Sequence, residues 1–353
     1  MQMTQRKLSP RDAVERWLDS IRPDRSDQTV STYWYRLKLF VEWCEEEKVK
    51  SISDLDGWLI DSYKTYRRGV NPSQSTLKNE FSTLKNFLEY CARIELVDES
   101  LPEKVEVPSV SKQDRSSDII LKPQDSKALL TYYRNSDGQY GSRGHALLEL
   151  TWHTGARVGG IQSLDLDDED AKAGARYLLF KNRPEEDTRL KKGYAGERAI
   201  GLPESVWGVF DHYKRHYRIG ITDEFGRKPL ITSNQGRPTK GTLRNWMYEA
   251  TIPCHHTDCP HGKRRATCEW TDYNHASNCP SSRSPHQVRS GAITWMLNKG
   301  MPIGKVADKV NATEDVIREH YDKPDPVDEL LERRIEFSEQ LDIGNQEDGY
   351  NDK

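Results

Sequence analysis

The chain has 353 residues, of which 35% are hydrophobic and 31% are charged, and its mean hydropathy is -0.88. This length favours two domains over a single core. No apolar run approaches the roughly 20 residues that a membrane-spanning helix requires, and the opening MQMTQRKLSP lacks the apolar stretch of a signal peptide. These features exclude a membrane protein and predict a globular, cytoplasmic one.

The net charge of -3 is distributed unevenly along the chain. Residues 326–353 contain nine acidic and three basic residues, a net charge of -6, so the other 325 residues carry +3. DNA binding depends on a local patch of Lys and Arg rather than on the total charge. A weakly basic body with an acidic tail is therefore compatible with DNA binding without requiring it.

Residues 1–100 have the pattern of a helical bundle. Apolar side chains recur at helical spacing in three of its segments, and a fourth segment reads as a further helix; the four are 9–21, 29–49, 54–66 and 75–91. Ser9 is placed to cap the first helix, and Pro10 suits its first position. We expect exposed Lys and Arg side chains of this bundle to face a DNA backbone.

Residues 101–118 are polar and show no apolar period, and they include Pro102 and Pro108, which predicts a linker. Two helical and two strand-like segments come after it, at 122–135, 143–155, 175–182 and 197–203. We predict a second domain at 119–325 that is mainly α-helical with a small antiparallel β-sheet. An acidic helix and tail at 326–353 complete the chain.

Candidate phosphate-binding side chains lie in the second predicted domain. A helix through Leu148 is expected to stop at Gly155 and to present Arg157 from the turn beyond it. His286 and Arg289 are three residues apart, so both lie on one face of the first turn of a helix, where anions are favoured. The alternatives are a surface arginine in a turn and an exposed or capping HxxR pair.

Tyr321 lies late in a short helical segment that Pro324 ends. A phenol with a pKa of about 10 needs a neighbour to take its proton, and an arginine-rich pocket favours the phenolate. Arginines grip the non-bridging oxygens of a phosphodiester, a histidine moves a proton, and a tyrosine forms a covalent phosphoester. This set suits phosphate-ester chemistry without a metal, although a tyrosine is more often a packing residue.

The order of an arginine, a lysine-bearing hairpin, an HxxR helix and a late tyrosine resembles the tyrosine recombinase family, which includes phage integrases and Xer-like enzymes. The resemblance covers nearly the whole chain, because 1–100 is similar to the core-binding (SAM-like) domain and 119–325 to the catalytic domain. The roles that it implies are phosphate binding by Arg157 and Arg289, proton transfer by His286, and nucleophilic attack by Tyr321 to form a 3'-phosphotyrosyl link.

The family's general-acid lysine lies on a hairpin between two strands, which corresponds here to residues 180–203. Lys191 and Lys192 both precede the second strand. We prefer Lys191 and keep Lys192 as the alternative; solvated hairpin lysines are the competing interpretation for either one.

The chain departs from the family pattern at two positions. Asn311 stands where the family usually has a histidine or tryptophan. An amide donates a hydrogen bond but does not move a proton, so its expected role is transition-state stabilisation. Gly160 replaces an acidic residue that usually follows the first arginine, and Asp165 or Asp167 is a candidate to compensate.

A cysteine-rich insert at 254–279 precedes the HxxR helix. The expected zinc ligands are Cys254, Cys259, Cys268 and Cys279, with His255, His256, His261 or His275 as possible substitutes. Disulfides are the alternative, which a reducing compartment disfavours. Similar inserts occur in the archaeal branch of the family, and the metal would be structural. Three basic residues at the tip, Lys263, Arg264 and Arg265, are candidates for phosphate contact.

The resemblance implies a site-specific DNA recombinase for integration, excision or replicon resolution that uses no ATP and no catalytic metal. Double-stranded DNA is the expected partner, bound by a tetramer on two sites, with a monomer or dimer when free. The C-terminal helix either packs on a neighbouring protomer or is solvated. The competing functions are a catalytically impaired DNA-binding regulator on the same fold, which Asn311 and Gly160 motivate, and a type IB topoisomerase-like enzyme.

Overall fold

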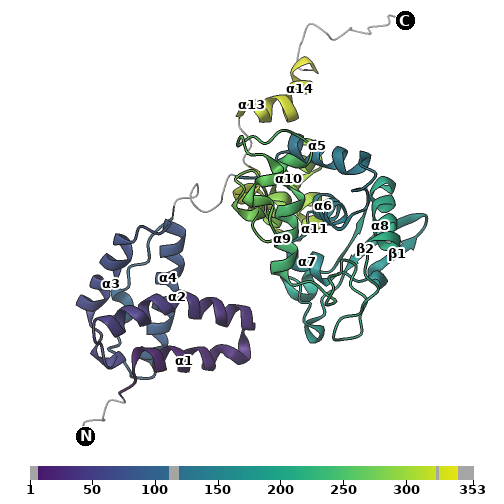
Figure 1. Cartoon of the computed structure of the whole chain (residues 1–353). Helices are drawn as coiled ribbons and strands as arrows, with labels where there is room; N and C mark the ends of the chain where they lie inside the picture. The colour runs from purple at the N-terminus through teal and green to yellow at the C-terminus, as the bar shows by residue number, and fades with distance from the viewer. Residues whose placement is uncertain (1–6, 111–118, 323–325, 341–353) are drawn as a thin grey trace, which may run out of the picture. The chain divides into compact units, whose positions relative to one another are not determined.

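The computed structural model describes residues 7–110, 119–322 and 326–340. The chain divides into two compact units, Met1–Ser117 and Asp118–Lys353 (Figure 1). Each unit has its own buried hydrophobic core. No helix in these three stretches is long and apolar enough to cross a membrane.

The first unit is a helical bundle, as the sequence predicted. Its helices within residues 7–110 are α1 (Pro10–Ile21), α2 (Asp27–Glu46), α3 (Gly57–Gly69) and α4 (Gln74–Arg93). Each begins with a capping side chain that accepts a backbone N–H, and the predicted cap at Ser9 is confirmed. Cys44 and Cys91 are fully buried in the core between them, which agrees with their places on apolar helix faces.

The predicted linker is wrong at its start. Leu101–Lys104 forms a short 3-10 helix, and Leu101 and Val105 are buried in the core of the first unit. The two apolar side chains are four residues apart, which is too short a stretch to show a period in the sequence. The first unit therefore continues beyond residue 100, while residues 111–118 of the predicted linker lie outside the described part of the chain.

The second unit is mainly α-helical with a small sheet (Figure 1). Its elements are α5 (Pro123–Asn135), α6 (Arg143–Thr154), α7 (Val158–Ser163), β1 (Glu169–Lys172), β2 (Ala175–Phe180), β3 (Arg198–Gly201), α8 (Glu204–His216), α9 (Lys240–Ala250), α10 (Pro285–Asn298), α11 (Ile303–Val310), α12 (Glu314–His320), α13 (Pro326–Glu329), the π-helical turn η12 (Leu330–Arg334) and α14 (Ile335–Gln340). The predicted fold class is confirmed.

The sheet has the order β1-β2-β3 and is antiparallel throughout. The sequence predicted β2 and β3 but missed β1, whose residues EDAK are polar and mostly exposed. An edge strand this short has no apolar alternation to reveal it. The long connection from β2 to β3 carries the two candidate lysines.

Helix α6 is buried along most of its length and packs against α5, α8, α9 and α10. It ends at Gly155, which has the left-handed conformation (φ 58°) that the predicted stop requires. The central helix thus delivers the turn that carries Arg157.

Helix α10 is seated against the chain that precedes α5. The backbone N–H of Leu121 donates to the carbonyl of Gln287 at 3.1 Å. A Cβ on Gly291 would lie 1.8 Å from the carbonyl oxygen of Leu121, so only glycine permits this approach. The packing fixes the helix that carries His286 and Arg289.

Candidate active site

Arg157 caps the start of α7 with extended backbone, directly after the turn at Gly155. Its side chain is half-buried, and its Nη1 donates to the carbonyl of Asn311 at 2.7 Å. The guanidinium is therefore directed into the second unit and held by α11. The simple alternative of a surface arginine in a turn does not describe it.

His286 and Arg289 lie in the first turn of α10, which Ser284 and Gln287 close with a reciprocal capping box. Arg289 is fully buried. Its Nη1 donates to the carbonyls of Gly155 and Val310, whereas its Nη2 is buried without a hydrogen-bond partner. A buried charged donor that lacks an acceptor indicates a ligand, because leaving it unpaired is costly.

Tyr321 lies directly beyond α12 and is 7% exposed. Its Oη accepts from Nε of Arg289 at 3.3 Å, and its ring centroid lies 5.8 Å from that of His286. Its carbonyl accepts from the hydroxyl of Thr294 at 3.2 Å, so α10 holds the tyrosine by backbone as well as side chain. The structure thus brings Arg157, Arg289, His286 and Tyr321 to one place.

Desolvation of the His286 ring lowers its pKa below the usual range, and the positive charges of Arg289, Arg157, His320 and Lys191 lower it further. The imidazole is therefore neutral at neutral pH and available to accept a proton. Its side chain is exposed at the surface of the unit, where a substrate can reach it.

Asn311 ends α11 in a left-handed conformation with φ 52°. Its Nδ2 donates to the carbonyl of Lys191 at 3.0 Å, while its own carbonyl accepts from Arg157. Asn311 therefore joins the hairpin turn, through its side chain, to Arg157, through its backbone. Donation of the second Nδ2 hydrogen to a phosphate oxygen stays a prediction.

Both candidate lysines are exposed on the connection between β2 and β3. Lys192 has the left-handed conformation with φ 82°, so the chain changes direction directly after Lys191. The ammonium of Lys191 is close enough to lower the pKa of His286. This influence supports the choice of Lys191 over Lys192 as the general acid, which stays a prediction.

Arg198 is a residue of this site that the sequence did not single out. It lies on β3, with its guanidinium 4.3 Å from the centroid of the Phe180 ring. Burial lowers the pKa of Arg198 to about 10, and the charges of Arg289 and Arg157 contribute. A third guanidinium therefore belongs to the same cluster, but no motif spacing marked it.

Of the two acidic residues that we expected to compensate near Arg157, Asp165 is used elsewhere. Asp165 binds Arg227 at 2.7 Å and also pairs with Arg237, and Asp167 is exposed. A Cβ on Gly160 would lie 3.4 Å from the Phe180 ring, so that ring takes up the space beside Gly160. The proposed compensation by Asp165 is wrong, since its carboxylate belongs to a separate ion-pair network.

The cysteine-rich insert contains only short 3-10 turns, η8 to η11, between Pro253 and Asn278. Its four cysteines are free thiols. Burial raises the pKa of the Cys254 thiol, and the neighbouring Cys259 and Cys279 contribute to the rise, against the charge of Arg265. Two of the other predicted ligands, Cys259 and Cys279, thus lie within electrostatic range of Cys254.

No group of three His, Cys, Asp or Glu side chains in the described stretches forms an arrangement that could hold a metal ion. Of the predicted substitutes, His255 has both ring nitrogens engaged, by the carbonyl of Glu249 and by Arg265. Zinc in this insert therefore stays a prediction.

Two of the three basic residues at the tip of the insert, Lys263 and Arg265, contact other residues of the insert. Lys263 pairs with Glu269 at 3.1 Å and lies 4.0 Å from the centroid of the Trp270 ring. Arg265 donates to the carbonyl of Cys254, and Arg264 is exposed. Phosphate contact by these three residues stays a prediction, for which Arg264 is the most available.

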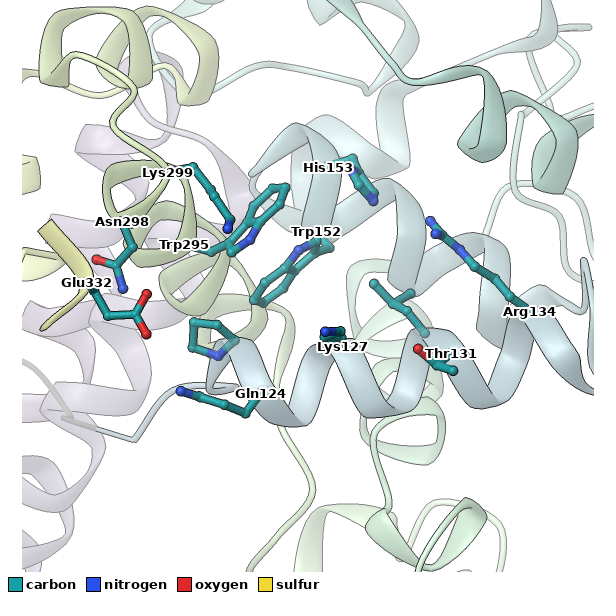
Figure 2. Close-up of a pocket in the computed structure, with 12 residues that line it drawn as sticks. Gln124, Lys127, Thr131, Arg134, Trp152, His153, Trp295, Asn298, Lys299 and Glu332 are labelled. Carbon is teal, nitrogen blue, oxygen red and sulfur yellow. The ribbon is translucent and has the colours of Figure 1, made fainter. Parts of the chain in front are cut away.

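A pocket of about 500 Å³ lies elsewhere on the second unit, between α5, α6 and α10 (Figure 2). Trp152 and Trp295 form its wall, with ring centroids 5.8 Å apart, and Lys127, Arg134 and Lys299 are among its other lining residues. None of its lining residues belongs to the arginine cluster, so the candidate chemistry lies outside this pocket.

Comparisons with known proteins agree with the predicted fold and with the resemblance to tyrosine recombinases. Residues 14–94 match the family described as phage integrase, N-terminal SAM-like domain. Over 303 residues the chain is 24% identical to tyrosine recombinase XerD of Staphylococcus epidermidis, a match that covers 85% of this chain and 90% of that protein. The chain is therefore similar to tyrosine recombinases over most of its length.

Two solved structures have the fold of this chain. The Tn1549 transposon integrase in complex with transposon right end DNA has a TM-score of 0.61 at 15% identity, and the match covers 95% of this chain and 99% of that one. The XerH site-specific recombinase bound to difH substrate has a TM-score of 0.59 at 16% identity, and that match covers 95% and 85%. An archaeal origin of the insert stays a prediction.

Proposed function

We propose that this recombinase cleaves and rejoins double-stranded DNA at specific sites through a 3'-phosphotyrosyl intermediate on Tyr321. The observation that carries the proposal is the hydrogen bond between Arg289 and Tyr321 beside a buried, unpaired guanidinium nitrogen. A phosphate placed there would accept from Nη2 of Arg289 while the phenol oxygen stands next to it.

The proposed reaction exchanges one phosphodiester for another. The oxygen of Tyr321 forms a bond to phosphorus, its proton passes to the neutral imidazole of His286, and the bond from phosphorus to the 5'-oxygen breaks. Lys191 gives a proton to the departing 5'-oxygen. Arg157 and Arg289 stabilise the charge on the non-bridging oxygens. Attack by a 5'-hydroxyl of another strand then releases Tyr321, so no ATP is required.

The proposed assembly is a tetramer on two DNA sites, formed from a free monomer or dimer. The C-terminal segment supports it, because its apolar side chains are exposed in this chain; they are Val327, Leu330, Leu331, Ile335 and Phe337. The segment 326–353 also carries a net charge of -6. We propose that this segment packs on a second copy of the chain. Because DNA is the substrate, the cytoplasm remains the proposed location.

A structural zinc ion in the insert remains part of the proposal. The influence of Cys259 and Cys279 on the Cys254 thiol supports it, as does the scarcity of apolar residues between 254 and 279, where the buried residues are Cys268, Ala276 and Cys279. Such a loop gains order when thiolates bind a metal. No step of the strand transfer involves this metal.

Covalent capture on a library of nicked duplexes tests the proposed function. The nick lets the cleaved end diffuse away, so a phosphotyrosyl adduct accumulates, and sequencing of the trapped DNA gives the target site. We expect an adduct with the unaltered protein and none with Tyr321→Phe. Tight binding without an adduct indicates the DNA-binding regulator, and relaxation of any supercoiled plasmid by a monomer indicates the topoisomerase-like enzyme.

A further inference from the structure

The C-terminal end of α11 gathers three guanidiniums. The carbonyls of Lys309, Val310 and Asn311 are consecutive, and each accepts from a different arginine: Arg198 Nε at 2.7 Å, Arg289 Nη1 at 2.8 Å and Arg157 Nη1 at 2.7 Å. The last carbonyls of a helix lack intrahelical donors and carry partial negative charge. The three carbonyls at the end of α11 therefore stabilise three neighbouring guanidiniums.

Arg198 differs from the other two arginines because it also binds the lysine-bearing connection. Its Nη1 donates to the carbonyl of Gly196 at 2.9 Å, so one side chain spans from α11 to the turn that follows Lys191. The stacking of its guanidinium on Phe180 fixes the direction of the side chain.

Asn311 forms a second tie between α11 and the same turn, through its Nδ2 and the carbonyl of Lys191. Gly196 makes this contact possible. A Cβ there would lie 2.7 Å from Nδ2 of Asn311 and 2.9 Å from the carbonyl oxygen of Lys191. The turn is thus anchored at both of its ends to the helix that gathers the arginines.

We propose that Arg198 and Asn311 are positioning residues for the general acid: they hold the Lys191 turn against α11, so that the lysine ammonium meets the departing 5'-oxygen. This inference rests on the proposed function. A lysine on an exposed connection samples many backbone positions as well as many rotamers, and backbone ties near it remove much of the backbone freedom.

The chemistry of the leaving group separates this role from phosphate binding. An alkoxide leaves slowly unless it receives a proton. A thiolate is a far weaker base, with a pKa of about 8.5 for an ordinary thiol, and leaves without one. A duplex with sulfur in place of the bridging 5'-oxygen therefore needs Tyr321 and the arginines that hold the phosphate, but does not need Lys191.

The experiment compares single-turnover cleavage of matched 5'-oxygen and 5'-sulfur duplexes that carry the captured target sequence. We expect Lys191→Ala to slow the oxygen substrate by about 100-fold or more and to leave the sulfur substrate nearly unchanged. Arg198→Met, which keeps the stem over Phe180, is expected to slow the oxygen substrate by at least about tenfold with the same rescue by sulfur.

Asn311→Gly gives an independent measurement if Arg198→Met is poorly folded. Glycine keeps the left-handed backbone and the carbonyl that binds Arg157, and removes only the amide that binds Lys191. The same selective loss is expected. Arg289→Ala is the control for a phosphate-binding residue, and it should slow both substrates alike.

Equal slowing of both substrates by Arg198→Met and Asn311→Gly would overturn the inference in favour of phosphate binding, as would unchanged rates on both. Sulfur rescue of Lys192→Ala in place of Lys191→Ala would also overturn it, since the tie would then hold the wrong lysine. Failure of the unaltered protein to form an adduct with either duplex would instead reject the proposed function.

Discussion

Nε of Arg289 lies 3.3 Å from Oη of Tyr321, although the two residues are 32 positions apart in the chain. The same guanidinium contacts the carbonyl at Gly155, before Arg157, and the carbonyl at Val310, before Asn311. Arg289 is thus the side chain around which the nucleophile and the other arginine are arranged.

We predict that Arg289→Lys slows formation of the covalent adduct by about 100-fold to 1,000-fold. A lysine keeps the positive charge. Its single ammonium cannot replace the planar guanidinium, which contacts two carbonyls, the phenol oxygen and a phosphate at the same time. Single-turnover cleavage of the captured duplex measures the effect, with binding to the same duplex as the control. A loss of less than about tenfold would show that charge alone is sufficient.

The pH dependence of cleavage is expected to follow His286. Because the pKa of His286 in the folded protein lies below the usual value of about 6.5, the imidazole stays neutral until the pH falls below that value. Cleavage should therefore be level near neutral pH and fall on the acid side, with its midpoint below 6.5.

His286→Gln tests the assignment of this acid limb. Glutamine keeps a hydrogen-bonding group but cannot take up a proton in this range, so the limb should disappear from a slower profile. An acid limb that persists unchanged in His286→Gln would assign the titration to another group.

Gly291→Ala is expected to destabilise the second unit by about 1–3 kcal/mol and to reduce cleavage. The added Cβ would collide with the backbone at Leu121, so either that segment or α10 must move. Thermal unfolding of the full chain measures the effect. Gly220→Ala is the matched control, because a Cβ at that position has open space.

The insert is expected to hold about one zinc ion per chain, given the usual four-ligand structural site. Elemental analysis of the purified protein measures the metal, and a thiol assay after chelation counts the released cysteines. Cys279→Ser should lower the zinc content, whereas Cys44→Ser, in the other unit, should not. Zinc-free protein with four reactive thiols between 254 and 279 would reject the site.

Assembly on DNA is expected to depend on the exposed apolar face of the C-terminal segment. The pair Leu331→Gln and Ile335→Gln should reduce the number of protomers bound to two sites, since polar side chains gain less from burial against a neighbour. Sedimentation of the protein with its captured duplex measures this number. Ile219→Gln, another exposed apolar side chain, is the control; equal complexes for all variants would contradict the role.

The fold class could be predicted from the sequence, because the helical spacing of apolar residues and the strand-like runs are strong local signals. It placed four site residues in order, but their convergence depends on α6, α10 and α12 packing together, which no local pattern specifies. Arg198 was missed because it contacts the backbone carbonyls of Gly196 and Lys309. Every residue has a backbone carbonyl, so the residue types in the sequence do not reveal such contacts. Asp165 was assigned to Arg157 because the two residues are close in the sequence. Its carboxylate instead binds Arg227 and Arg237, which lie 62 and 72 positions away.

Because three consecutive carbonyls at the end of α11 bind three arginines, the number of residues in this short helix is tightly constrained. Each residue added to or removed from an α-helix rotates everything beyond it by about 100°. A single-residue deletion between Ile303 and Val310 would therefore swing three acceptors away from three arginines together. Substitutions can weaken the contributions to strand transfer one at a time, but a change in the length of this helix would remove them all at once.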